Sequence, residues 1–159
     1  MLGIQLGKLG IDYVTRRERE ISAVTLEDAK RILSAAEAKA ESLGTAYNVA
    51  VVDAGGHLLA FVRQDGALIG SIELAIDKAV TARILEKATH DLANLAQSGK
   101  PLFGIHESNG GKVVIFGGGI PVVLDGSVVG AVGASAGTVE QDVAVAEAGI
   151  TALVVVATD

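Results

Sequence analysis

The sequence contains no cysteine and very few aromatic residues. Without cysteine the chain cannot form disulfide bonds, thiolate metal sites or cysteine nucleophiles, and its redox compartment stays undetermined. Aromatic residues make up 3% of the 159 residues, so few rings are available to stack on nucleic-acid bases. The net charge of −6 also repels phosphate backbones and anionic lipid. We therefore expect no nucleic-acid partner and no membrane partner.

Long hydrophobic runs are missing as well. No apolar stretch approaches the roughly 18–20 residues that span a bilayer. The first 14 residues lack the continuous apolar segment of a signal peptide, so we expect a cytoplasmic protein. Half of the residues are nonetheless hydrophobic, and 159 residues is a common size for one domain. We expect an N-terminal extension over residues 1–20, which ends in a charged cluster, and a single domain over residues 21–159.

Helical periodicity is clearest directly after Thr25. Thr25 is a favourable N-cap, apolar residues then recur at helical spacing as far as Leu43, and Gly44 can end the helix in a left-handed conformation. Further helices are expected over residues 70–87, over 91–97, and from Thr138 to about residue 154, where Thr138 and Gln141 have capping-box spacing. The helix over residues 70–87 is expected to bury a face formed by Ile72, Ala75, Ile76, Ala79, Val80, Arg83 and Ile84.

Five β-branched or apolar runs predict strands, over residues 47–52, 57–63, 112–116, 120–124 and 127–134. A Gly-rich turn joins the first two, and Asp125-Gly126, a strong two-residue hairpin signal, joins the last two. Neighbouring strands joined by hairpin turns indicate an antiparallel sheet covered by helices. The predicted fold class is therefore α+β, with a five-stranded antiparallel sheet flanked by helices.

The histidines give no metal-binding pattern. His57, His90 and His106 are far apart in the sequence, and no HExxH or similar spacing occurs, so we predict no metal site. His106 is the most interesting of the three, because it lies in a Gly-rich polar loop, and such loops often line ligand pockets.

The glycine run that starts at Gly117 does not match a nucleotide-binding motif. Its glycines permit either a close-packed entry into a strand or a backbone N–H surface for an oxygen-bearing ligand, and both interpretations stay open. The turn before the last helix can likewise receive a carboxylate at the helix start, unless Glu140 and Gln141 cap the helix themselves. The candidate ligand-binding residues are Gly117, Gly118, Gly119, Ile120, Pro121, Ser135 and Thr138.

Lys78 stands out because it interrupts an otherwise apolar helix. A buried lysine can act as a base or hold an anion; a solvent-facing or salt-bridged lysine is the alternative. Together with Asp53, His106 and Glu140, Lys78 completes the set of tentative acid–base residues.

Several blocks together resemble the HbpS/GlcG-like (haem-degrading-domain-like) family, which is related to the C-terminal domain of PduO-type proteins. The resemblance covers about residues 21–154, with the blocks in the family's order. The blocks are VVDAGGHLL at 51–59, AIDKA at 75–79, GGIPVVLDG at 118–126, VGAVGAS at 129–135 and TVEQD at 138–142.

This resemblance implies a profilin-like α-β-α arrangement, assembly into homo-oligomers, and binding of haem or a corrinoid. It also implies an axial histidine in the first helix for PduO-type domains, whereas residues 25–43 contain none. We therefore expect an oligomeric small-ligand-binding protein, with haem as a possible cofactor. Two alternatives stay open: a cofactor-independent isomerase, hydratase or lyase that acts on a small organic acid or polyketide-like compound, and a structural or accessory subunit.

Overall fold

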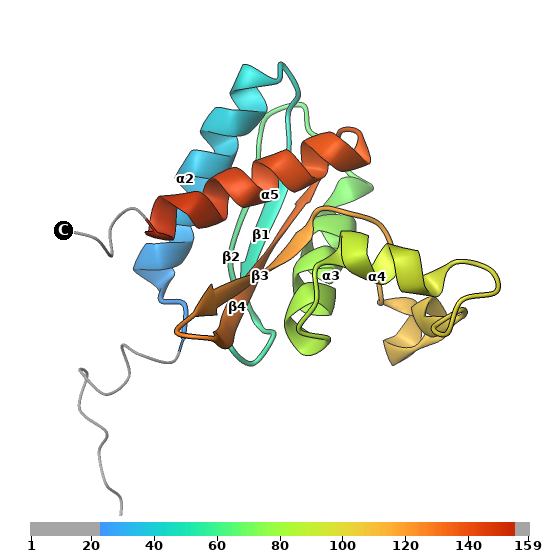
Figure 1. Ribbon diagram of the computed structural model, residues 1–159. Helices are drawn as coiled ribbons and strands as arrows, with labels where there is room; N and C mark the ends of the chain where they lie inside the picture. The colour runs from blue at the N-terminus through green and yellow to red at the C-terminus, as the bar shows by residue number, and fades with distance from the viewer. Residues whose placement is uncertain (1–22, 155–159) are drawn as a thin grey trace, which may run out of the picture.

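The computed structural model describes residues 23–154, so the expected extension over residues 1–20 lies outside the described residues. In the described part, an antiparallel sheet is covered by helices on both faces (Figure 1). Two helices pack together over one face, and a third lies over the other. None of the helices in residues 23–154 is long and apolar enough to cross a bilayer. The first pair is α2 (Leu26–Ser42) and α5 (Val139–Val154); the opposite face carries α3 (Ser71–Ile84), which is followed by α4 (Thr89–Ala96).

The sheet has the strand order β2-β1-β4-β3, with every neighbouring pair antiparallel. The two central strands are the most buried, and every residue of β1 is buried. The prediction of a mixed α and β fold with an antiparallel sheet is confirmed, but residues 23–154 contain four strands and not five. These are β1 (Asn48–Val52), β2 (Leu58–Arg63), β3 (Gly119–Leu124) and β4 (Ser127–Ser135).

Local sequence signals account for the ends of α2 and for the β3–β4 turn. Thr25 caps α2 in a capping box with Asp28, and Gly44 has a φ of +67° just after the helix, as predicted. Asp125 and Gly126 have φ values of +49° and +78°, the left-handed pair that a tight hairpin requires, so this turn is confirmed too. The third helix to be predicted, α4, begins at Thr89 and therefore two residues earlier than expected.

The predicted strand over residues 112–116 is wrong, because side chains of a helix take the backbone groups of this segment. The Thr81 hydroxyl of α3 donates to the Lys112 carbonyl (3.3 Å) and accepts from the Val114 N–H (3.0 Å). Gly118, with a φ of +115°, then bends the chain before β3 begins. The segment is β-branched and apolar, but it has no strand neighbour.

A second threonine occupies the outer edge of β3. The Thr89 hydroxyl accepts from the Gly119 N–H (2.9 Å) and lies 3.4 Å from the Gly119 carbonyl oxygen, to which it donates. Pro121, two residues further along, has no N–H to offer a neighbouring strand. At the edge where a fifth strand would pair, the Thr89 hydroxyl thus binds both backbone groups of Gly119, and Pro121 offers no N–H group.

The buried face of α3 also differs from the prediction, because this helix lies unusually close to the sheet. A Cβ on Gly133 would overlap the Ala75 carbonyl, and a Cβ on Gly119 would overlap the Lys78 carbonyl. This close approach excludes large side chains, and the core on this side consists mainly of alanines. Ile72, Ile76, Val80 and Arg83 are only half-buried and Ile84 is exposed, whereas the buried residues are Ser71, Ala75, Lys78, Ala79, Thr81 and Ala82.

Substitution of Gly133 tests this close approach. Gly133→Ala should lower the free energy of unfolding by more than about 3 kcal/mol, because the new methyl group meets helix backbone that cannot move aside. Gly70→Ala is the matched control: Gly70 has right-handed helical dihedrals and no atom within 4 Å of the new Cβ, so stability should stay the same or rise by up to about 1 kcal/mol. Urea denaturation measures both, and equal stabilities would contradict the close helix–sheet contact.

Candidate functional site

A fully buried lysine is the most unusual feature of the structure. Lys78, on α3, has no exposed surface, and its Nζ lies 2.5 Å from Oδ2 of Asp142 on α5. The same Nζ donates to the Ala134 carbonyl of β4 (3.0 Å). Burial lowers the pKa of the Lys78 ammonium below its ordinary value, although the hydrogen bond and the charge of Asp142 oppose this shift. The structure combines parts of both interpretations of Lys78: the lysine is buried, and it forms a salt bridge.

The ion pair joins helices that lie on opposite faces of the sheet (Figure 1). It passes the sheet where β3 begins, and Gly118 leaves the room that it needs. A Cβ on Gly118 would lie 2.9 Å from the Lys78 Nζ and 2.9 Å from the Asp142 Cβ. Gly118 therefore has a packing role next to the two charges.

Asp142 also organises the start of α5. Its second oxygen, Oδ1, accepts from the N–H groups of Ala136 (3.1 Å) and Gly137 (3.0 Å). The Gln141 side chain accepts from the Thr138 N–H (3.0 Å), and the Thr138 hydroxyl accepts from the Gln141 N–H (3.3 Å), which confirms the capping box. The backbone donors of residues 136–138 thus have partners within the chain. Ser135 is buried and Thr138 is exposed at this turn.

Tyr47 completes the surroundings of Asp142. Its side chain is buried, and its hydroxyl lies beside Asp142 and Gly137 without a hydrogen bond of good geometry. Burial, together with the Asp142 charge, raises the pKa of the Tyr47 phenol above its ordinary value. The phenol therefore stays protonated at neutral pH.

The glycine run lies beneath the surface. Gly117, Gly118 and Gly119 are buried, and Ile120 and Pro121 are half-buried in β3. A Cβ on Gly117 would lie 2.8 Å from side-chain carbons of both Val139 and Val143 and 3.3 Å from the Cβ of His90. The close-packing interpretation therefore accounts for these glycines, and their backbone lies beneath the surrounding side chains.

Three partly exposed side chains surround Gly117, and we call them the Phe116 face: His90, Phe116 and Val139. Their exposed fractions are 42% for the His90 side chain, 38% for Phe116 and 41% for Val139. The Lys78 Nζ lies 4.7 Å from the centroid of the Phe116 ring, within the range of a cation–π contact. The Phe116 face is therefore a partly exposed area around Gly117 that contains an imidazole, an aromatic ring and an aliphatic side chain, and its aromatic ring lies near the Lys78 ammonium.

The other acid–base candidates do not join Lys78. In residues 23–154, none of Asp53, His106 and Glu140 forms a hydrogen bond or ion pair with it. Asp53 lies in the β1–β2 turn, where its Oδ1 accepts from two backbone N–H groups, and the His106 Nε2 lies 3.3 Å from a Glu107 oxygen. Glu140 is fully exposed, and its pKa is held below the ordinary value by its own backbone N–H and by the Thr138 side chain. Residues 23–154 contain no cluster of three or more His, Asp or Glu residues that could hold a metal ion.

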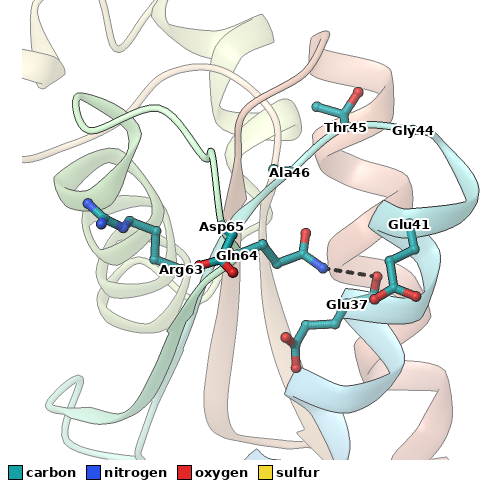
Figure 2. Close-up of a pocket in the computed structure, with 8 residues that line it drawn as sticks. All are labelled: Glu37, Glu41, Gly44, Thr45, Ala46, Arg63, Gln64 and Asp65. Atoms are coloured by element: carbon teal, nitrogen blue, oxygen red, sulfur yellow. Dashed lines mark hydrogen bonds between the residues drawn. The ribbon is translucent and has the colours of Figure 1, made fainter.

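A cleft of about 550 Å³ lies elsewhere, between the end of α2 and the end of β2 (Figure 2). The Gln64 side chain crosses it and donates to the Glu37 carbonyl at 3.4 Å. Three carboxylates line the cleft and it has no aromatic wall, so its chemistry suits a polar or cationic molecule. Its lining consists of Glu37, Glu41, Gly44, Thr45, Ala46, Arg63, Gln64 and Asp65.

Sequence reasoning did not single out Asp142, Tyr47 or Phe116 as site residues. For Asp142 a signal was available: a carboxylate one turn before the buried apolar positions Val145 and Ala146 needs a partner. For Phe116 no signal was available, because its contact with Lys78 exists only in the folded chain.

The fold and the site define a small α+β domain. Helices flank both faces of its sheet, and a buried ion pair connects a helix on one face to a helix on the other. The chain belongs to the HbpS-like family, described as haem degrading protein HbpS-like, whose family model matches residues 24–151. An uncharacterised 15.0 kDa protein from the dhaT-dhaS intergenic region of Citrobacter freundii is 43% identical over 131 residues, which are 82% of this chain and 92% of that protein.

Two solved structures support the same assignment. Klebsiella pneumoniae protein ORFY is 34% identical, with a TM-score of 0.82 over 89% of this chain and 98% of that one. The PduOC:haem complex is 40% identical, with a TM-score of 0.77 over 79% of this chain and 91% of that one. The predicted family is thus confirmed.

Removal of the buried lysine tests the ion pair. Lys78→Met should lower the free energy of unfolding by about 3–5 kcal/mol, because it leaves the Asp142 carboxylate buried without a counter-charge. Lys30→Met is the control: Lys30 lies 4.0 Å from Glu27 in an exposed pair, so its loss should cost less than about 1 kcal/mol. Urea denaturation at neutral pH compares the two. Similar small losses would show that the buried pair is dispensable.

Proposed function

We propose that this chain is an oligomeric small-ligand-binding protein that takes haem, or another planar tetrapyrrole such as a corrinoid, on the Phe116 face. The observation that carries the proposal is that three partly exposed residues lie around Gly117: His90 and Val139 both approach it, and Phe116 precedes it in the chain. A planar apolar ligand needs such a surface, and haem iron commonly takes an imidazole as axial ligand. The relative solved as a PduOC:haem complex supports the choice of haem.

The residue types in the described part of the chain show which side chain could be an axial ligand of haem. Besides histidine, haem proteins use cysteine, methionine or tyrosine as axial ligands. The chain has no cysteine, its one methionine and Tyr13 lie outside the described residues, and Tyr47 is buried as a protonated phenol. Among the described residues, histidine is therefore the fitting ligand type. Among the three, His90 adjoins exposed apolar side chains on two other segments of the chain.

The cleft in Figure 2 does not fit haem. Its carboxylates, Glu37, Glu41 and Asp65, would face the propionates of a haem molecule, and it offers neither an aromatic wall nor an imidazole. The Phe116 face is the better location, although a single chain leaves it open to solvent. We infer that a second copy of the chain covers the other side of the ligand, as the proposed homo-oligomer would allow.

An enzyme that works without a cofactor is less well supported. General acid–base chemistry needs its groups within hydrogen-bond reach of one substrate. Lys78 is enclosed, and Asp53, His106 and Glu140 lie on separate segments and form no hydrogen bond or ion pair with it.

Hemin titration tests the proposal. Stoichiometric hemin should give a shifted Soret band, and His90→Ala should abolish the shift or weaken binding at least about tenfold, because it removes the axial imidazole. His57→Ala is the matched control, since His57 is exposed in the β1–β2 turn and should leave the spectrum unchanged. The absence of any shifted band with the unaltered protein would overturn the haem proposal. A normal band in His90→Ala would overturn the assignment of His90. Size-exclusion chromatography with and without hemin reports the assembly.

A further inference from the structure

Three donor directions leave the buried ammonium of Lys78, and two of them are taken by oxygen atoms. Nζ donates to the Ala134 carbonyl at 3.0 Å and to Asp142 at 2.5 Å. A lysine ammonium carries three N–H groups. The Phe116 ring also lies over the ammonium, with its centroid 4.7 Å from Nζ. One side of this ring is therefore turned toward a buried cation, while 38% of the residue stays exposed.

Hydrogen bonds fix the chain on either side of Phe116 but not at Phe116 itself. The segment before it is tied to α3 by the Thr81 hydroxyl, which reaches Lys112 and Val114 and no residue beyond them. Among the described residues, the backbone groups of residues 115–117 form no hydrogen bonds. The bend at Gly118 follows directly. The ring thus lies on an irregular stretch between two anchors, where its own contacts decide its orientation.

We propose that Lys78 is a positioning residue for the ligand surface: it holds the Phe116 ring against the ion pair and so presents the outer side of the ring on the Phe116 face. Lys78 touches no ligand itself, because it is completely enclosed. Asp142 sets the direction of the ammonium through its ion pair, and Ala134 sets it through the carbonyl. This inference rests on the proposed function, which makes the Phe116 face the ligand surface.

The geometry also explains why the Lys78 ammonium needs open space next to it. An ammonium attracts an aromatic ring when it lies over the face within about 6 Å of the centroid. Lys78 reaches this position only because Gly118 leaves space next to Nζ. A neutral side chain of similar length would fill the same space without the attraction, so the ring would be free to turn toward solvent.

The chain contains no tryptophan, which permits a direct measurement of the ring. Phe116→Trp places the only indole of the protein over Lys78, and its fluorescence anisotropy and quenching by acrylamide report how firmly it is held. Combining Phe116→Trp with Lys78→Met should lower the anisotropy and raise the quenching constant, with the circular dichroism spectrum preserved. Unchanged anisotropy and quenching in a folded double variant would overturn the proposal.

Phe103→Trp is the matched control. Phe103 is 65% exposed on the loop after α4, and among the described residues no cation lies over its ring. Lys78→Met should leave the fluorescence of Trp at this position unchanged. An equal change at both positions would show general loosening of the fold and would also overturn the positioning role.

A second series keeps Lys78 and avoids the risk that Lys78→Met fails to fold. Fluorinated tryptophans incorporated into Phe116→Trp label position 116 alone and weaken the attraction to a cation step by step. Anisotropy should fall with each added fluorine. A flat series would contradict the proposal even if Lys78→Met cannot be purified.

Hemin binding separates this inference from the proposed function. If both hold, Lys78→Met should weaken hemin binding by about 3- to 30-fold, the range that corresponds to a cation–π contact, and the Soret position should stay that of the unaltered protein. Hemin affinity that does not change in folded Lys78→Met overturns the positioning role alone. If hemin fails to bind the unaltered protein, the proposed function fails, while the fluorescence measurements still decide whether Lys78 orients the ring.

Discussion

The ion pair between Lys78 and Asp142 is the contact on which the arrangement of the layers depends. It connects α3 to α5 past the start of β3, and both charges are enclosed. A buried charge is tolerated only when its partners are complete. Here the ammonium has a carboxylate, a carbonyl and an aromatic ring, and the carboxylate also accepts from two backbone N–H groups at the start of α5. One pair of side chains therefore links a strand end, a helix start and a surface ring.

The packing on the α3 side makes this pair possible. Gly119 and Gly133 let the helix backbone lie directly on the sheet, so the lysine reaches the other layer at the strand end. The Thr81 hydroxyl takes up backbone groups of residues 112 and 114, and the Thr89 hydroxyl takes up those of Gly119 at the outer edge of β3, so no fifth strand pairs there. The chain before β3 stays irregular as a result, and Phe116 can lie over the ammonium with its other side toward solvent.

This arrangement bears on how a member of the HbpS-like family can hold a ligand. The described chain offers a partly apolar surface with one imidazole, and its cleft is lined by carboxylates. A surface of this kind encloses a planar molecule only when something covers its other side. We propose that the buried charges contribute through the orientation of a ring, whereas the sequence had left a base, an anion-holding lysine and a solvent-facing or salt-bridged lysine open for Lys78.

The sequence by itself determined the features that depend on a few neighbouring residues. Thr25, Gly44, Asp125-Gly126, and Thr138 with Gln141 all lie where their caps and turns were expected, because the residues that define each of them are at most four positions apart. The family followed from blocks of the same local kind. The tertiary structure decided the rest: Lys78 and Asp142 are 64 residues apart in the chain, and Thr81 meets Val114 across 33. Such contacts depend on how closely α3 lies on the sheet, and no local pattern encodes this distance. For this reason the predicted strand over residues 112–116 was wrong, and the partner of Lys78 emerged only from the folded chain.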